Sequence, residues 1–327
     1  MGKLSTEPAL RETATGFQIE AGFTLERVGH GNSEADIRPG SRTRTQFPRI
    51  SRSRMTLLGV LNHLWALSQL NRWGAGWKRD WWRVTQLLLP VIEQGAIGQQ
   101  ALMDCMYLVP ELSQGRRDAI DGAWLRFSQK LAPRKNNVKL GIVLGEAIRV
   151  RPSKFGFSLT LRYFAPYLFF SDALRSQLCT SFPHAYRCIG GEGEQHVIAM
   201  CLVEMSPKGN LTLIEAALMA TSEHFIPVDS GYETQLVKLL VDHNRSFFKP
   251  TKLETGESSA PDFVLTDTLP PTGLEVLEKN DIEYVARKAQ KLDLSSSPGN
   301  PFWVWVAFNH LPPPPLPGVQ HGIGSSR

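Results

Sequence analysis

The sequence predicts an α+β fold with a helical N-terminal region, a β-rich middle and a C-terminal module in which helices and strands alternate. Three patterns predict it: apolar residues recur at helical spacing after Met55, they alternate with a period of two after Val138, and both periods recur within residues 222–310. Of the 327 residues, 42% are hydrophobic and 20% are charged, so the chain can bury a substantial core. We expect four parts: a basic arm (1–54), a helical then β-rich domain (55–221), the alternating module (222–310) and a proline-rich disordered tail (311–327).

The elements of residues 1–221 follow from these periods and from the breakers between them. Residues 1–54 are rich in Gly, Ser, Thr and Arg, with one strand-like stretch at 17–25. Gly74 ends the first long helix, and Pro90 is expected to bend or interrupt the second. The expected helices cover 55–73, 77–94, 99–107, 114–131 and 171–181, and the expected strands cover 138–151, 155–164, 196–205 and 211–220. The last of these strands also fits a helix.

Residues 222–310 contain an ordered series of six elements. Leu236, Leu239 and Leu240 share one face of the first helix, 231–243. A second, charged helix is expected over 280–292, with Asn280 or Asp281 as its N-cap. The four expected strands cover 246–253, 261–267, 273–278 and 301–308. The predicted order is therefore α-β-β-β-α-β.

The formal charge of +5 is the sum of two opposed contributions. Residues 1–221 carry +9 (27 basic and 18 acidic residues), residues 222–310 carry −5 (8 basic and 13 acidic residues), and Arg327 adds one positive charge. The seventeen residues 38–54 contain six arginines and no acid. Such a segment favours binding to a polyanion such as DNA, and a solubilising leader is the alternative. The candidate DNA-binding residues of this arm are Arg42, Arg44, Arg49, Arg52 and Arg54.

A group of tryptophans and basic residues lies within the first two expected helices. A Trp-rich helical core is the preferred interpretation, and stacking on nucleic-acid bases is the alternative. The tryptophans are Trp65, Trp73, Trp77, Trp81 and Trp82, and the basic residues are Arg72, Lys78, Arg79 and Arg83.

Composition also excludes several protein classes. No stretch approaches the roughly 18 apolar residues that cross a bilayer, and the first residues lack the apolar core of a secretory signal. The four cysteines at 105, 179, 188 and 201 lack the spacing of a zinc knuckle, so we expect free thiols. A metal site that combines Cys179 and Cys188 with His184 and His196 is the alternative.

Three carboxylates in residues 222–310 are candidates for chemistry. Asp262 begins one predicted strand and Glu275 lies thirteen residues later in the next, so adjacent strands can bring both to one edge of a sheet. Glu233, on the preceding helix, can supply a third carboxylate. Hard divalent cations prefer such oxygen ligands and can activate water and neutralise charge on a phosphodiester. Surface carboxylates with no shared role are the alternative.

This arrangement resembles the PD-(D/E)xK, or restriction-endonuclease-like, nuclease superfamily over about ninety residues, especially the compact forms in which a Glu-bearing helix precedes Pro-Asp-Phe and a strand. The resemblance implies a restriction-endonuclease-like αβββαβ module in which Asp262, Glu275 and Glu233 hold Mg²⁺ (or Mn²⁺). It also implies a lysine two residues after Glu275, where this chain has Leu277. Some superfamily members carry the basic group on the following helix. Here that helix offers Lys288 and Lys291 to help the attacking water, and Arg287 to contact DNA.

The whole chain also resembles an uncharacterised bacterial family carried on plasmids and integrative conjugative elements. The segments that carry this likeness are LLGVLNHLW, IPVDSGYE and the YVARK helix. The resemblances together predict a cytoplasmic bacterial protein with no membrane association, which cuts or processes DNA of a mobile element with Mg²⁺ and works beside other mobile-element proteins. A catalytically inactive, nuclease-like DNA-binding or scaffold protein is the alternative, and Leu277 is the residue that favours it.

Overall fold

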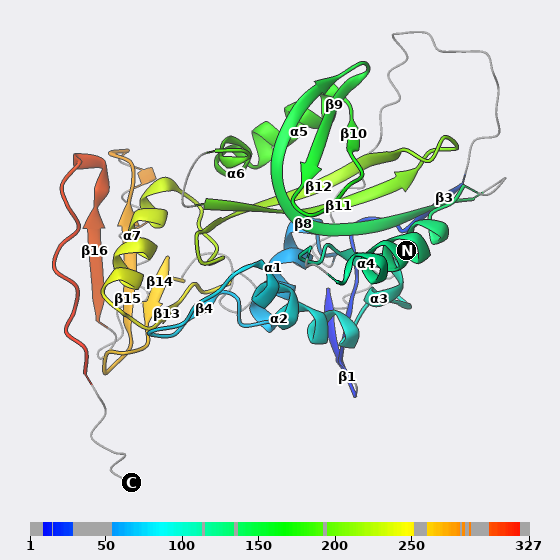
Figure 1. Ribbon diagram of the computed structural model, residues 1–327. Coiled ribbons are helices and arrows are strands. Elements are labelled where there is room, and N and C mark those ends of the chain that lie inside the picture. The colour runs from blue at the N-terminus through cyan, green and yellow to red at the C-terminus, as the bar shows by residue number, and fades with distance from the viewer. Residues whose placement is uncertain are drawn as a thin grey trace, which may run out of the picture. The chain divides into compact units, whose positions relative to one another are not determined.

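The computed structural model describes residues 9–14, 16–28, 54–112, 115–133, 137–191, 195–251, 260–281, 283–284, 288 and 301–320 (Figure 1). The chain divides into two compact units. Unit 1 comprises Met1–Leu64, Leu88–Gly190 and Val197–Leu218, and unit 2 comprises Trp65–Leu87, Gly191–His196 and Met219–Arg327. The second unit thus combines Met219–Arg327 with two earlier segments, a grouping that no linear division of the sequence indicates.

Unit 1 is built on a mixed sheet with the strand order β11-β12-β10-β9-β8-β3, and with β7 beside β8. The longest strand, β8, pairs with β11 through its first half and with β9 through its second half. A smaller sheet has the order β1-β2-β5-β6. The strands of the larger sheet are β3 (Glu26–Val28), β7 (Met106–Leu108), β8 (Asn137–Ser153), β9 (Gly156–Leu161), β10 (Leu168–Phe170), β11 (Gln195–Met205) and β12 (Leu211–Ser222). Those of the smaller sheet are β1 (Leu10–Thr13), β2 (Gly16–Ile19), β5 (Gly95–Ile97) and β6 (Gln100–Ala101).

Six of the helices precede or interrupt these strands. They are α1 (Leu57–Leu67), α2 (Trp81–Gln94), α3 (Leu102–Cys105), α4 (Arg117–Lys130), α5 (Asp172–Ser181) and α6 (Pro183–Cys188). Helix α5 begins where Ser171 Oγ accepts a hydrogen bond from Leu174 N, as an N-cap should. Helices α1 and α2 both contribute residues to unit 1 and to unit 2.

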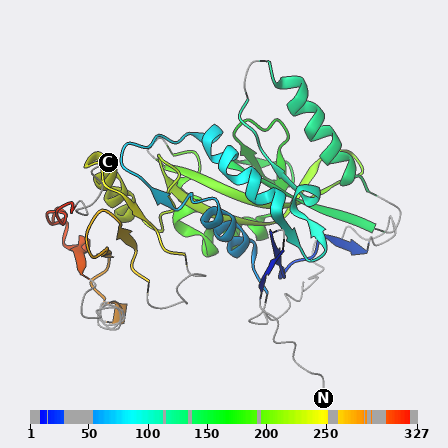
Figure 2. The same ribbon diagram turned by 90° about the horizontal axis from the view of Figure 1, so that it is seen from below.

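Unit 2 contains a five-stranded mixed sheet with the order β16-β15-β14-β13-β4. Strands β14 and β15 are antiparallel, whereas β15 and β16 are parallel. Helix α7 (Gly231–Asp242) lies against this sheet (Figures 1 and 2). Its residues Leu236, Val237 and Leu240 are buried. The strands are β4 (Arg72–Trp73), β13 (Phe247–Phe248), β14 (Phe263–Leu265), β15 (Thr272–Leu277) and β16 (Phe302–Val306). Between β15 and β16, residues 283, 284 and 288 are helical.

Several predicted elements need correction. Residues 99–107 form two short strands around the four-residue helix α3 rather than one helix, because strand pairing with β5 and β8 takes precedence over the apolar spacing. Helix α2 starts at Trp81, not at residue 77, since Asp80 Oδ1 accepts a hydrogen bond from Arg83 N. It continues through Pro90 without interruption. Residues 211–222 form a strand, which excludes the helical alternative.

The tryptophan group belongs mainly to the core of unit 2, as preferred from the sequence. Trp65, Trp73 and Trp81 are buried, whereas Trp77 and Trp82 are 52% and 46% exposed. Arg79 is also buried, and its guanidinium donates to the carbonyl oxygens of Leu70 (2.8 Å) and Arg72 (2.7 Å). This arginine therefore has a structural role that its charge alone did not indicate.

Candidate functional site

Strand register places Asp262 beside Glu275. Asp262 directly precedes β14, Glu275 lies within β15, and the pairing of Phe263 with Leu274 brings the two acids opposite each other. Asp262 N donates to Glu275 Oε2 (3.2 Å), and Asp262 Oδ2 accepts from Val276 N (2.9 Å). Both carboxylates are thus fixed by backbone contacts, and the side chain of Glu275 is fully buried.

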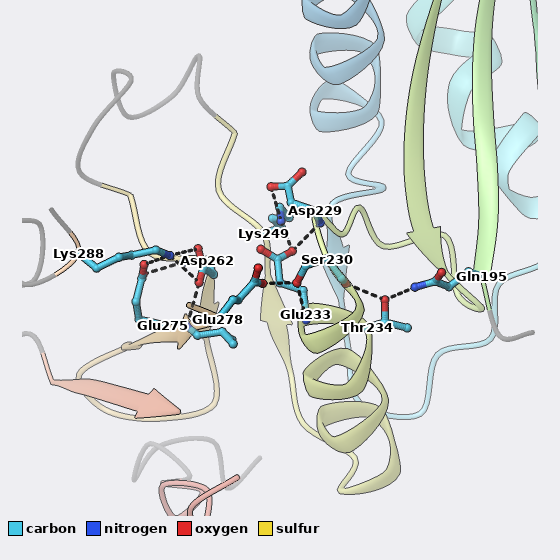
Figure 3. A network of polar contacts seen from close by, with 11 residues as sticks. Gln195, Asp229, Ser230, Glu233, Thr234, Lys249, Asp262, Glu275, Glu278 and Lys288 are labelled. Carbon is cyan, nitrogen blue, oxygen red and sulfur yellow. Dashed lines mark hydrogen bonds and ion pairs between the residues drawn. The ribbon is translucent and has the colours of Figure 1, made fainter. Parts of the chain in front are cut away.

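One ammonium group joins these two carboxylates. Lys288 Nζ lies 3.0 and 3.1 Å from the two carboxyl oxygens of Asp262 and also donates to Glu275 Oε1 (Figure 3). Burial lowers the pKa of Lys288, but the charges and hydrogen bonds of Asp262 and Glu275 outweigh it and raise the pKa above its usual range. Lys288 is therefore a charged counterion at neutral pH. We call Asp262, Glu275 and Lys288 the first cluster.

Tyr284 holds the segment that carries Lys288 against β15. Its hydroxyl donates to Val276 O (3.3 Å) and accepts from Glu278 N (3.3 Å), while its backbone N donates to Asp281 Oδ1 (2.8 Å). The last contact is the N-cap expected for this helix, with Asp281 rather than Asn280 as the cap. Lys279, by contrast, is exposed beyond the end of β15.

Glu233 belongs to a second cluster. Ser230 caps α7 by accepting from Glu233 N (3.2 Å), and Glu233 Oε2 turns back to accept from Asp229 N (2.8 Å). The same oxygen also accepts from Lys249 Nζ, which in turn lies 3.0 Å from Asp229 Oδ2. We call Asp229, Glu233 and Lys249 the second cluster. Glu233 therefore pairs with a lysine of its own, and its hydrogen bonds do not reach Asp262 or Glu275.

Further polar contacts extend the second cluster from the N-terminus of α7. Ser230 Oγ donates to Glu278 Oε1, and Thr234 Oγ1 accepts from Gln195 Nε2 (Figure 3). With Glu278, the network contains five carboxylates and two ammonium groups, a formal charge of −3 when all are ionised. A local field of this sign attracts cations and disfavours further negative charge.

Burial and neighbouring acids raise the pKa of Glu233 to about 7. Desolvation is the largest cause, and the charges of Asp229 and Asp262 add to it, whereas Lys249 opposes it. The acids of the network outnumber its lysines, so a raised pKa of Glu233 agrees with the net negative charge around it.

This shift predicts a pH-dependent stability. The pKa of the Glu233 carboxyl group is near 7 in the folded state, and its ordinary value is 4.5. The contribution of this group to stability is therefore fully present below pH 4.5, where the group is protonated, and is lost as the pH rises to about 7. The unfolding free energy of the wild type should therefore fall by on the order of 3 kcal/mol between pH 5 and pH 8. In Glu233→Gln, which has no titrating carboxyl group at this position, we expect this decrease to be absent. Urea unfolding at both pH values measures it, with the exposed Glu283→Gln as the control. An unchanged slope in Glu233→Gln would contradict the raised pKa.

The structure brings together only some of the predicted site residues. Asp262, Glu275 and Lys288 meet, and Glu233 lies in the neighbouring cluster. Arg54 is exposed in unit 1, and Leu277 is the last residue of β15. Lys291, Arg287, Arg42, Arg44, Arg49 and Arg52 lie outside the described residues.

Lys249 is the site residue that the sequence did not reveal. One local signal was available for its partner: Ser230 and Glu233 have the Ser-x-x-Glu spacing of a capping box, which indicates that the glutamate is used by the helix terminus. The role of Lys249 depends on the pairing of β13 with β14, and no spacing within the sequence indicates it.

The first cluster offers two protein ligands to a divalent cation. In the described part of the chain, no group of three or more His, Cys, Asp or Glu side chains is placed to hold a metal. Mg²⁺ often takes one or two protein carboxylates and completes its shell with water and phosphate oxygens, so Asp262 and Glu275 fit it. A cation there would use the oxygens that Lys288 now occupies. None of the four cysteines, all of which the structure describes, forms a disulfide.

Within the residues that the structure describes, no helix is both long and apolar enough to cross a membrane.

Comparison with known families gives a match. A search of curated proteins found no match. The model of a family described as "Protein of unknown function (DUF1173)" matches residues 1–307, nearly the whole chain. The chain therefore belongs to the DUF1173 family, and the expected membership of an uncharacterised family is confirmed.

Proposed function

We propose that unit 2 is a Mg²⁺- or Mn²⁺-dependent DNA nuclease, or a nuclease-like DNA-processing subunit, that serves a bacterial mobile element. The observation that carries this proposal is the convergence of Asp262 and Glu275, from adjacent strands, on Lys288 from the segment that follows β15. The two carboxylates have the chemistry of a hard-cation site. The motif expects a lysine at the position of Leu277, and in this proposal Lys288, beyond the end of the strand, takes its place. The order of elements around the pair supports the resemblance to PD-(D/E)xK nucleases.

Each residue of the first cluster has a role in this proposal. A divalent cation between Asp262 and Glu275 would supply Lewis-acid chemistry at a phosphodiester. Backbone hydrogen bonds hold the two carboxylates in position, so little reorganisation is required of them. Lys288 neutralises them before a cation enters and then becomes available to orient water or a phosphate oxygen. Glu233 and Lys249 support α7 and β13 from the second cluster.

Incubation of the full chain with supercoiled plasmid DNA tests the proposal. Nicked or linear product is expected with Mg²⁺ or Mn²⁺, and none is expected with EDTA. Intact DNA under both metals, with a folded protein, would contradict an enzymatic role.

A non-catalytic DNA-binding or scaffold protein is the second candidate. The contact that favours it is Lys288 itself, because a buried ammonium between two carboxylates can serve as a permanent structural counterion. This candidate predicts salt-sensitive retention of DNA without cleavage.

Metal binding by Lys288→Met separates the two candidates. If the lysine gives way to a cation, its removal is expected to tighten Mn²⁺ binding about tenfold or more, because a competing positive charge is lost. Titration calorimetry with Mn²⁺ measures this, and the exposed Lys279→Met is the matched control. Binding by the variant but not by the wild type would indicate the permanent counterion, and absence of binding in both would contradict the metal site.

A further inference from the structure

The chain after β16 returns along unit 2 as an extended strap, residues 311–320. The sequence led us to expect disorder in this region, yet four hydrogen bonds hold the strap in place. Trp305 Nε1 donates to Leu311 O (3.0 Å), and Trp303 Nε1 donates to Pro315 O (3.0 Å). Arg245 Nη1 donates to Pro317 O (2.8 Å), and Gln320 N donates to Asp267 O (3.0 Å). Figure 1 shows the strap beside β16.

The strap has the composition of a polyproline II helix. Residues 311–317 read Leu-Pro-Pro-Pro-Pro-Leu-Pro. Each proline fixes φ near −65° and excludes the helical region for the residue before it, so this backbone is extended. Prolines have no N–H to donate, and the backbone carbonyls of polyproline II remain free to accept. Recognition of such a segment requires aromatic surfaces with donors that point outward.

Unit 2 presents those donors from ordered elements. Trp303 and Trp305 are two residues apart on β16, so both indoles lie on one face of the strand, where Tyr232 packs edge-on against Trp305. Arg245 is buried, and Asp267 binds it through two hydrogen bonds of 2.9 and 2.7 Å. This pair fixes the guanidinium plane and aims the remaining Nη1 at the strap.

The strap lies on the surface of unit 2. None of its residues is buried, and Leu311 and Val319 are 59% and 46% exposed. Three of its four hydrogen bonds use backbone carbonyls, those of Leu311, Pro315 and Pro317, and any polyproline II segment presents the same carbonyls. The strap also follows the range that the family model matches, and it begins just after His310, which adopts a left-handed conformation (φ 56°).

We propose that Trp303, Trp305 and Arg245 form a receptor surface for polyproline II peptides, and that residues 311–317 are its intramolecular occupant. The ligand in trans is a proline-rich segment of a partner protein, which binds when the strap is released. The tether keeps the strap at a high effective concentration, so the partner must displace it. This inference is independent of the proposed nuclease activity.

A cleavable strap tests this proposal in the full chain. A protease site inserted after His310 allows the strap to be cut from the folded protein, and fluorescein-labelled peptide LPPPPLPGVQ is then titrated against it by fluorescence anisotropy. We expect saturable binding to the cut chain and at least about tenfold weaker binding to the uncut chain, because the tethered strap competes. The reference is the binding of LPPPPLPGVQ to the cut wild-type chain. The control peptide LSSSSLSGVQ should bind the cut wild-type chain at least about tenfold more weakly, and LPPPPLPGVQ should bind the cut Trp303→Phe chain at least about tenfold more weakly. An uncut chain with Ser at 312–315 should bind the labelled peptide at least about tenfold more tightly than the uncut wild type.

Three results would overturn the proposal. The cut chain could unfold, which would make the strap a structural part rather than a ligand. It could stay folded and yet bind LPPPPLPGVQ no better than LSSSSLSGVQ. A concentration-dependent dimer of the uncut wild-type chain, with exchanged straps, would make a second copy the occupant instead of a partner protein.

Discussion

Asp262→Asn and Glu275→Gln are each expected to slow metal-dependent cleavage of plasmid DNA by about 1000-fold. Each change removes one negative charge from the two-carboxylate site and keeps the size of the side chain. A loss of about 4 kcal/mol in transition-state stabilisation corresponds to this factor, and metal-assisted hydrolysis depends on contributions of that size. Initial rates of nicking at saturating Mn²⁺ measure the effect.

The matched control for these variants is Asp242→Asn, which changes an exposed carboxylate of the same unit. Unfolding curves and DNA binding by anisotropy should be compared in parallel, because Glu275 is fully buried and its replacement also alters the partner of Lys288. Loss of cleavage with retained folding and DNA binding supports the proposed function. Cleavage at the wild-type rate in both variants would place the activity elsewhere in the chain or in a contaminant.

The convergence of Asp262 and Glu275 could be predicted because it depends on local information. A turn of known composition joins two strands, and antiparallel pairing then brings residues before and after the turn opposite each other. The helix that carries Lys288 follows the second strand directly, so its approach to the same strand end was also predictable. These contacts join residues that are no more than 26 positions apart.

The placement of Glu233 shows where this reasoning stops. The sequence gives the helix and its acid, but three demands compete for one carboxylate: the helix N-terminus, a lysine and a metal. In the structure the carboxylate of Glu233 accepts hydrogen bonds from Asp229 N and from Lys249 Nζ. The second contact forms only when the chain between α7 and Lys249 has folded. The correct choice depended on the position of β13, whose two-residue length leaves almost no periodic signal.

The inclusion of residues 65–87 in unit 2 was unpredictable for a related reason. Strand β4 is two residues long and pairs with β13, about 175 positions later in the chain. Trp73 reads as the end of a helix in the sequence, because its apolar neighbours continue the helical spacing. The edge of a distant sheet, rather than local propensity, determines its conformation.

Lys249→Met is expected to destabilise unit 2 by about 3–5 kcal/mol, the largest stability effect in the network. The substitution leaves Glu233, which is 4% exposed, without its cationic partner. It also removes the contact of the ammonium with the ring of Phe263, whose centroid lies 5.1 Å away. The ion pair with Asp229 should contribute little, because that side chain is 75% exposed. Urea unfolding at pH 8, where Glu233 is largely ionised, measures the loss, with Lys279→Met as the exposed control.

A double-mutant cycle shows whether the loss comes from the stranded carboxylate. In Glu233→Gln/Lys249→Met neither charge is present, so the double variant should be more stable than Lys249→Met alone, by a coupling of a few kcal/mol. The coupling should shrink at pH 5, because protonation of Glu233 then removes the same charge that the glutamine removes. Equal destabilisation of the single and double variants at both pH values would mean that packing of the lysine stem, rather than its charge, is what stabilises the second cluster. If the coupling is found, Lys249 stabilises the fold through its charge.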